Sequence, residues 1–253
     1  MNIKMIVTDL DGTILRDDKT VTDYTINILQ KCRDKGIKLT FATGRGGTTQ
    51  MDLPIDLFDG FALTNGALAF ADGKKIYSKP IPIPSARQLL TAADKAGVSV
   101  AAEIGGRHCA NFNVGEIWEY LEYEMIDFNG IDFEPHKIYA PVSSLKTVEL
   151  LKSLLPDDLY MTVTRDDLAM VMHKDATKSK AIEALAAHWG IQQSEIVAFG
   201  DDLNDIDLLK YCGVSVAVSN ALDEIKAIAD FISDSNEDDG VAKWIYLYTS
   251  EEK

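Results

Sequence analysis

The chain has 253 residues, 46% of them apolar and 26% charged, which is enough for one large domain or two of ordinary size. Its net charge of -15 argues against nucleic acid and anionic membranes as partners, because both require a basic surface. No apolar run reaches the roughly 18 residues of a membrane-spanning helix. Asp9 and Asp11 fall where the apolar core of a signal peptide would lie. Cys32, Cys109 and Cys212 form no C-x-x-C motif, which is typical of reduced cysteines in a cytoplasmic protein.

The first predicted element is a buried strand over residues 5–7. Its continuous apolar character favours a parallel strand, and open α/β sheets bind ligands at the carboxyl ends of such strands. Asp9 and Asp11 follow at that end and point the same way if the chain is still extended. Two carboxylates about 4 Å apart repel by roughly 4 kcal/mol. Such a pair indicates a bound cation or a raised pKa on one carboxyl group.

A helix and a second strand follow. Thr22 or Asp23 can cap a helix that runs to about residue 35, and Gly36 ends it. Residues 37–42 predict a second buried strand, parallel to the first because a β-α-β crossover joins them. This strand ends in Thr-Gly-Arg-Gly-Gly at 43–47, so we expect that loop at the same sheet edge as the first carboxylates.

The pattern changes after the next strands. Residues 60–77 are predicted as strands separated by two hairpin signals, Asn65-Gly66 and Asp72-Gly73. The run Lys-Pro-Ile-Pro-Ile-Pro at 79–84 can continue neither a helix nor a central strand. We therefore expect a linker there, leading into a second domain.

The second domain, residues 82–174, is expected to be a small α+β unit with a largely antiparallel sheet. Its predicted helices span 85–96, 116–124 and 144–155, and its predicted strands 98–103, 107–113, 137–140, 160–164 and 169–173. From residue 175 the β-α alternation returns, with helices at 178–189, 205–212, 220–229 and 241–248 and strands at 196–199, 214–218 and 231–232. Residues 1–81 and 175–253 are thus expected to form one doubly wound, parallel, Rossmann-like α/β core.

Three predicted strand ends bring polar residues to one edge of this core. They are Asp9 with Asp11, then Thr43-Gly44-Arg45, and Asp201 with Asp202, Asn204 and Asp205. Oxygen ligands of this kind suit magnesium, usually held by one or two carboxylates, waters and a substrate phosphate. Lys178, in the first turn of a helix, could add a positive charge. Phosphoryl transfer requires mainly positioning and charge neutralisation, and this set can provide both.

The motifs resemble those of the haloacid dehalogenase superfamily, specifically its Cof-type phosphatases with a large inserted cap domain. Asp-Leu-Asp-Gly-Thr at 9–13 and Gly-Asp-Asp-Leu-Asn-Asp at 200–205 are highly specific for the superfamily. The resemblance covers essentially the whole chain, including Val-Ala-Val-Ser-Asn-Ala at 216–221 and Glu-Asp-Asp-Gly-Val-Ala at 237–242. It implies a hydrolase core with an inserted α+β cap.

By position, the resemblance also implies catalytic roles. Asp9 would be the nucleophile and form an aspartyl-phosphate, with Asp11 the general acid and then the base. Magnesium would be held by the Asp9 carboxylate, the Asp11 backbone carbonyl and the Asp201 carboxylate. Asp205 would bind the ion directly or support its ligands.

The same resemblance implies a phosphate-binding set. Thr43 and the Gly44 amide would bind the phosphoryl oxygens, Lys178 would neutralise them, and Asn204 would orient the site. The family usually has glycine after this lysine, but here the run is Lys-Ser-Lys. The register with the following Ala-Ile favours Lys178, and Lys180 stays open as the alternative.

The expected function is hydrolysis of a small phosphorylated metabolite, with a sugar phosphate as the leading substrate class. Asp11 favours ester hydrolysis over dehalogenation, which needs no acid for an alkoxide. The alternatives are a phosphomutase using the same intermediate and a non-catalytic phosphometabolite-binding protein. A hairpin at Gly105-Gly106, flanked by Glu103, Arg107 and His108, is one candidate for substrate contact. The sequence leaves the oligomeric state open.

Overall fold

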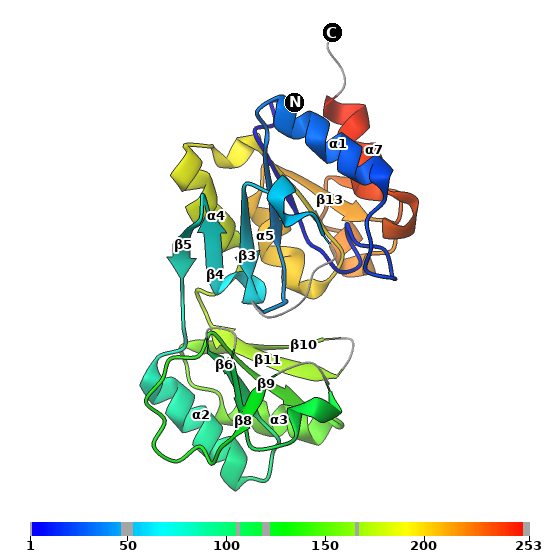
Figure 1. Ribbon diagram of the computed structural model, residues 1–253. Coiled ribbons are helices and arrows are strands. Elements are labelled where there is room, and N and C mark those ends of the chain that lie inside the picture. The colour runs from blue at the N-terminus through cyan, green and yellow to red at the C-terminus, as the bar shows by residue number, and fades with distance from the viewer. Residues whose placement is uncertain (1, 47–52, 105–106, 118–121, 165–166, 250–253) are drawn as a thin grey trace. The chain divides into compact units, whose positions relative to one another are not determined.

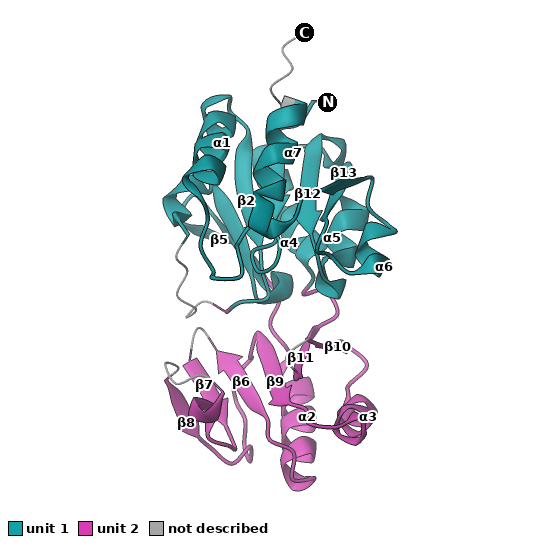
Figure 2. Cartoon of the chain, turned by 90° about the vertical axis from the view of Figure 1, so that its right-hand side faces the viewer, with its two compact units in different colours: residues 1–45, 50–77, 177–253 teal, residues 46–49, 78–176 magenta. Residues whose placement is uncertain are grey.

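The computed structural model describes residues 2–46, 53–104, 107–117, 122–164 and 167–249. The chain divides into two compact units, coloured separately in Figure 2. Unit 1 comprises Met1–Arg45, Gln50–Tyr77 and Thr177–Lys253, and unit 2 comprises Gly46–Thr49 and Ser78–Ala176. Unit 2 is therefore largely a single insertion between two halves of unit 1.

Unit 1 is built on an eight-stranded sheet in the order β14-β13-β12-β1-β2-β3-β4-β5 (Figure 1). From β14 to β3 the neighbouring strands are parallel, and β4 is antiparallel to β3. The predicted α/β class with a doubly wound parallel sheet is confirmed. The strands are β1 (Met5–Thr8), β2 (Lys38–Ala42), β3 (Gly60–Leu63), β4 (Leu68–Ala71), β5 (Lys74–Ser78), β12 (Ile196–Gly200), β13 (Val214–Val218) and β14 (Phe231–Ser233).

The helices of unit 1 cover both faces of this sheet. Helix α1 packs against α7, and α4 packs against α5 on the other face (Figure 1). Thr22 caps α1 by accepting a hydrogen bond from the Thr25 amide, as the sequence indicated. The helices are α1 (Asp23–Asp34), α4 (Lys178–Trp189), α5 (Ile206–Tyr211), α6 (Asp223–Lys226) and α7 (Gly240–Thr249).

The register of the central strands aligns their carboxyl ends. Thr8, the last residue of β1, pairs with Phe199 of β12 on one side and Phe41 of β2 on the other. All four residues of β1 are buried, as expected for a strand covered on both faces. The loops that follow β1, β2 and β12 therefore leave the sheet side by side, where doubly wound folds bind their ligands.

Unit 2 contains a six-stranded sheet in the order β10-β11-β9-β6-β7-β8. Helices α2 (Ile83–Lys95) and α3 (Leu145–Leu154) pack together on one face of it (Figure 2). All pairs are antiparallel except β7 with β8, which are parallel. The strands are β6 (Ala101–Ile104), β7 (Arg107–Ala110), β8 (Tyr123–Met125), β9 (Lys137–Pro141), β10 (Leu159–Val163) and β11 (Leu168–His173).

Three sequence-based boundaries are corrected. Helix α2 begins at Ile83, two residues before the predicted start at residue 85. Pro84 fits in its first turn because an amide hydrogen at that position would have no partner within the helix. The helix expected at 116–124 is wrong at its end, where Tyr123–Met125 pairs with β7 as an edge strand. Helix α6 is only one turn long. The turns expected at 105–106 and 165–166 lie outside the described residues.

Short 3₁₀ helices connect several elements, at Ile55–Leu57, Thr64–Gly66, Val114–Glu116, Gln193–Glu195, Leu203–Asp205 and Asn236–Asp238. Over the described part of the chain, no helix has the length and apolar character needed to cross a membrane. The three cysteines carry thiols, not disulfides.

Candidate active site

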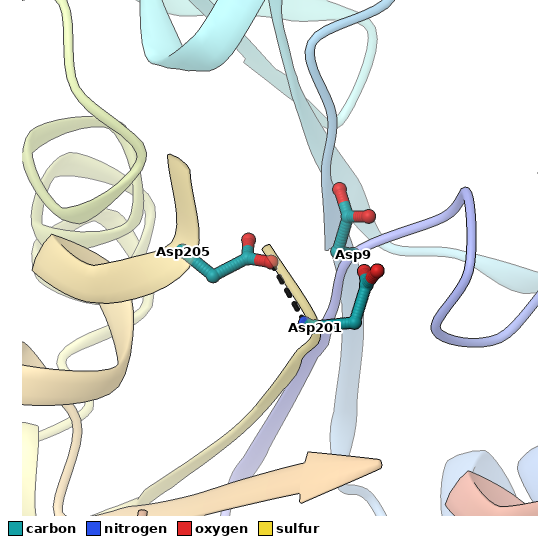
Figure 3. A group of neighbouring side chains, drawn as sticks. All are labelled: Asp9, Asp201 and Asp205. Carbon is teal, nitrogen blue, oxygen red and sulfur yellow. Dashed lines mark hydrogen bonds between the residues drawn. The ribbon is translucent and has the colours of Figure 1, made fainter. Parts of the chain in front are cut away.

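Three buried carboxylates meet at the carboxyl edge of the central sheet. Asp9 directly follows β1, Asp201 directly follows β12, and Asp205 ends the short helix after it. One oxygen from each lies within 4.8 Å of the others. Figure 3 shows the three side chains converging where the two strands end. The first and third strand-end motifs of the sequence are therefore brought together.

Backbone geometry fixes these carboxylates in place. One oxygen of Asp205, Oδ2, accepts a hydrogen bond from the amide of Asp201 at 3.0 Å (Figure 3). The same oxygen accepts from the amide of Asp202 at 3.1 Å. The Thr13 hydroxyl donates to Asp201 Oδ1 at 2.8 Å. Gly12 has a φ of 77°, and a Cβ there would lie 2.7 Å from Asp201 Oδ2. The Asp-Gly-Thr spacing is thus required for the first loop to reach Asp201.

Lys178 connects two members of this acidic cluster. Its Nζ donates to Asp9 Oδ1 and Asp205 Oδ1, both at 2.6 Å, and the residue is only 1% exposed. Thr177 caps α4, so Lys178 is the first residue of the helix. Lys180 instead forms an exposed ion pair with Glu183 at 2.8 Å. Of the two candidate lysines, the structure places Lys178 beside the carboxylates.

Lys178 balances only part of the negative charge of the three carboxylates. Burial raises the pKa of Asp9 well above its usual range, despite the opposing effect of Lys178. Burial and the neighbouring Asp205 raise the pKa of Asp201 to about 6. Burial opposes the charge on Lys178, but Asp205 and Asp9 outweigh it and raise the lysine pKa. Burial thus makes these carboxyl groups hard to ionise unless a positive charge compensates them. Divalent cations prefer carboxylate oxygens as ligands, so the cluster could hold such an ion.

Asp11 has partners of its own and lies outside this cluster. The chain turns at Leu10, and the Asp11 carboxylate forms ion pairs with Arg45 at 2.6 Å and Lys19 at 2.9 Å. Burial would raise the pKa of Asp11, but the hydrogen bonds from Arg45 and Lys19 lower it. Each carboxylate therefore has its own cationic partners, Lys178 for Asp9 and Arg45 with Lys19 for Asp11. These partners offset the repulsion that was expected between the two carboxylates.

The second strand-end motif contributes a compact loop beside the cluster. The amide of Thr43 donates to the Ala62 carbonyl at 3.0 Å, and its hydroxyl accepts from the Arg45 amide at 3.1 Å. Gly44 lies against the side chain of Asn65, since a Cβ on Gly44 would be 3.0 Å from Asn65 Oδ1. Asn204 donates to that same oxygen at 3.0 Å. Asn65 thus joins the second and third motifs.

Sequence reasoning gave no role to two of these residues. Arg45 appeared only as part of a glycine-bearing loop, and Asn65 only as a hairpin signal. Strand β3 is parallel to β2, which the sequence pattern does not indicate. Residues Thr64-Asn65-Gly66 therefore follow β3 at the same edge of the sheet as the other motifs. An Asn-Gly pair after an apolar strand can be a fourth strand-end loop as well as a turn.

The polar residues around the candidate hairpin of unit 2 are largely internal. Glu103 is buried and forms an ion pair with Lys137 at 3.1 Å. His108 is buried and shares a hydrogen bond of 2.9 Å between its Nδ1 and the Tyr139 hydroxyl. Arg107 is exposed, and the tip of the hairpin lies outside the described residues. A role of this hairpin in substrate contact stays a prediction.

A model of the haloacid dehalogenase-like hydrolase family matches residues 6–245. The chain belongs to this family. The match spans both halves of unit 1 and the whole insertion, so the resemblance read from the motifs is confirmed.

Related proteins and structures agree with this assignment. A 5-amino-6-(5-phospho-D-ribitylamino)uracil phosphatase of Bacillus subtilis is 28% identical, over 97% of this chain and 95% of the relative. A solved sugar phosphatase of subclass IIB has a TM-score of 0.86 and 25% identity, over 97% of this chain and 99% of that one. A phosphatase from Bacteroides thetaiotaomicron has a TM-score of 0.87 and 26% identity, over 98% and 96%. The chain is accordingly a phosphoric monoester hydrolase of the superfamily.

Proposed function

We propose that the protein is a magnesium-dependent phosphatase that hydrolyses a sugar phosphate or a closely similar phosphorylated metabolite. The observation that carries this proposal is the cluster of Asp9, Asp201 and Asp205 with Lys178. In this proposal Asp9 is the nucleophile, and the neighbouring groups would hold a cation and neutralise a phosphate. Asp11, two residues after Asp9 in the chain, forms ion pairs with Lys19 and Arg45.

In the first step, a carboxylate oxygen of Asp9 attacks the phosphorus atom of the ester. The bond from phosphorus to Asp9 forms while the bond to the alcohol oxygen of the substrate breaks. Asp11 donates a proton to that oxygen, so the leaving group departs as a neutral alcohol. Lys178 holds Asp9 Oδ1 in a fixed orientation for this attack.

In the second step, the aspartyl-phosphate on Asp9 is hydrolysed. Asp11, now ionised, takes a proton from a water molecule as that water attacks phosphorus. The bond between phosphorus and Asp9 breaks, which releases inorganic phosphate and restores the carboxylate. Arg45 orients Asp11 by its two hydrogen bonds of 2.6 Å, which favour the ionised form that acts as the base.

The phosphoryl group is bound by residues of the second and third motifs. Thr43 and the Gly44 amide donate to its oxygens, Lys178 neutralises its charge, and Asn204 orients the loop. Asp9, Asp201 and the backbone carbonyl of Asp11 would hold magnesium, with Asp205 supporting them. The bound ion would neutralise the charge of the phosphoryl oxygens and so allow a carboxylate to approach them.

We assign residues 1–81 with 175–253 to the hydrolase core and residues 82–174 to an inserted cap domain. The compact units support this division, with their own boundaries at 77/78 and 176/177. The cysteine thiols support a cytoplasmic enzyme.

The proposed substrate class rests on the relatives. One similar structure is that of a sugar phosphatase, and two relatives from Bacillus subtilis act on a phosphate carried by a ribityl chain. Both substrates carry a phosphate ester on a polyhydroxylated carbon chain. We therefore expect this chain to prefer phosphorylated sugars or sugar alcohols over nucleotides and aryl phosphates.

The direct test is phosphate release from a panel of hexose, pentose and pentitol phosphates, nucleotides and cofactor phosphates, measured with magnesium. We expect the highest kcat/KM among the sugar and sugar-alcohol phosphates, with no activity in the Asp9→Asn variant. A preference for nucleotides would refute the substrate class. Hydrolysis that survives Asp9→Asn would refute the phosphatase site itself.

The same experiment separates the two alternatives. A phosphomutase would convert a sugar monophosphate to its isomer and release little phosphate, so product analysis beside the phosphate assay distinguishes it. A non-catalytic binding protein would bind members of the panel without turnover. Net phosphate release with no accumulated isomer supports the hydrolase.

A further inference from the structure

The loop after β3 has an unusual backbone. Thr64, Asn65 and Gly66 all have positive φ values, of 55°, 51° and 89°. Glycine adopts such values freely and asparagine tolerates them, but a β-branched threonine does so rarely. A strained conformation persists only where its surroundings fix it, and such strain is concentrated at functional sites. The loop therefore needs an explanation beyond that of an ordinary hairpin turn.

The surroundings that fix this loop are the phosphate-binding motifs. The amide of Thr64 donates to the Arg45 carbonyl and the amide of Asn65 to the Thr43 carbonyl, both at 2.9 Å. On its other side, a Cβ on Gly66 would lie 2.0 Å from the Thr177 carbonyl, beside the start of α4. The loop is thus packed between the second motif and the helix that carries Lys178.

The side chain of Asn65 extends this connection to the third motif. It is 2% exposed, its Oδ1 accepts a hydrogen bond from Asn204, and it lies against Gly44. Asn65 Nδ2 and Asn204 Oδ1 are buried and have no hydrogen-bond partner within the described residues. Exchanging nitrogen and oxygen in both amides would move the NH₂ group that lacks a partner to Asn204, so the assignment of this donor to Asn65 follows the amide orientation that the structure gives. In this orientation the buried Asn65 Nδ2, which would lie 3.6 Å from a Cβ on Gly44, is a donor that lacks an acceptor among the described residues.

We propose that Asn65 is a further phosphoryl-binding residue, whose amide NH₂ donates to an oxygen of the phosphoryl group held by the Thr43–Gly44 loop. This inference rests on the proposed phosphatase function. The strained loop delivers a neutral donor into a site whose other side chains are mostly charged. The bond between Asn65 and Asn204 then fixes the second and third motifs at one spacing around the bound group.

The test measures binding of inorganic phosphate, with magnesium present, by calorimetry. Asn65→Gly keeps the left-handed backbone without strain and removes the donor, and Asn65→Asp keeps the shape but presents an acceptor. We expect phosphate affinity to fall about 10- to 100-fold in Asn65→Gly, as for a lost hydrogen bond to a charged group, and further in Asn65→Asp. Asn65→Gly also loses the hydrogen bond from Asn204, so its thermal stability should fall somewhat. Asn65→Asp keeps an acceptor for that bond, so a larger loss of phosphate affinity with a smaller loss of stability in Asn65→Asp is the result that a purely structural role does not predict.

Asp167→Gly is the matched control, because Asp167 also has a positive φ, of 54°, but is exposed in unit 2. It should bind phosphate as the wild type does. If both Asn65 variants bind phosphate as tightly as the wild type, the amide serves the loop or a bridging water only, and the inference is wrong. If Asp9→Asn leaves hydrolysis intact, the proposed function fails whatever the Asn65 variants show.

Discussion

Arg45 holds the carboxylate of Asp11 through two hydrogen bonds, from Nε to Oδ2 and from Nη2 to Oδ1, each of 2.6 Å. This bidentate pair joins the loop after β2 to the loop after β1. Planar two-point contacts of this kind fix orientation as well as charge. In the proposed mechanism, Arg45 therefore positions the group that transfers the proton.

The first prediction concerns this pair. Replacing Arg45 with Ala should lower kcat for alkyl phosphates about 100-fold, because a misplaced acid no longer reaches the leaving oxygen. The loss in the first step should be smaller for p-nitrophenyl phosphate, whose leaving group needs no proton. Arg45→Lys should recover only part of the activity, since lysine cannot form the two-point contact. Single-turnover kinetics of leaving-group release with both substrates measures the difference.

Lys19 provides the control for that experiment. Its ion pair with Asp11 is largely exposed, so Lys19→Ala should change kcat little on either substrate. Equal losses in the rate of the first step on alkyl and aryl phosphates in Arg45→Ala would show that Arg45 does not position Asp11 as the acid.

The second prediction separates the two lysines of α4. Lys178→Met should abolish turnover and destabilise the protein by up to about 3–5 kcal/mol, because it leaves Asp9 and Asp205 buried without their cation. Lys180→Met should leave activity unchanged and alter stability by less than about 1 kcal/mol, because its ion pair is exposed. Urea unfolding and phosphate release measure both. Loss of turnover in Lys180→Met alone would reverse the assignment.

The third prediction concerns pH and magnesium. The pKa of Asp201 is raised to about 6, so Asp201 binds a proton in the metal-free protein at weakly acidic pH, and the raised pKa of Asp9 acts in the same direction. Magnesium competes with these protons, so its affinity should be highest above about pH 7 and fall at least about tenfold per pH unit below about pH 6. Calorimetric titration of the metal at several pH values checks this.

In the metal-free protein, folding stability should decrease as pH rises. A raised carboxyl pKa means that the folded state holds its proton more tightly than the unfolded state does. Stability from this source is present below the unfolded pKa and declines as pH rises through about 6, the folded pKa of Asp201. Magnesium should therefore raise the melting temperature more at neutral pH than at acidic pH. A metal affinity independent of pH would contradict the buried carboxylate site.

Much of the core could be predicted because its signals are local. Continuous apolar strands such as Met5–Thr8 end in polar loops, and parallel order places those loops on one edge. The position of Lys178 in the first turn of α4 also follows from local sequence, since Thr177 is a good cap. Local sequence patterns were therefore sufficient to predict that three motifs and a lysine lie at the same edge of the sheet.

The remaining features depend on contacts that local pattern does not contain. The pairing of Arg45 with Asp11 is set by how two loops approach each other. Asn65 could not be distinguished from an ordinary hairpin residue without knowing that β3 runs parallel to β2. Tyr123–Met125 forms a strand because β7 offers it an edge, which overrides its helical pattern. In each case tertiary contact decided the outcome.

The central claim is that Asp9 takes the phosphoryl group and Asp11 then activates the water. The most direct measurement is mass spectrometry of the Asp11→Asn variant, acid-quenched during reaction with p-nitrophenyl phosphate. This substrate needs no acid to leave, while hydrolysis of the intermediate needs the missing base. We expect a phosphoryl group on the peptide that contains Asp9, and none in the Asp9→Asn, Asp11→Asn double variant. Turnover without any phosphorylated peptide, or phosphate on another residue, would contradict it.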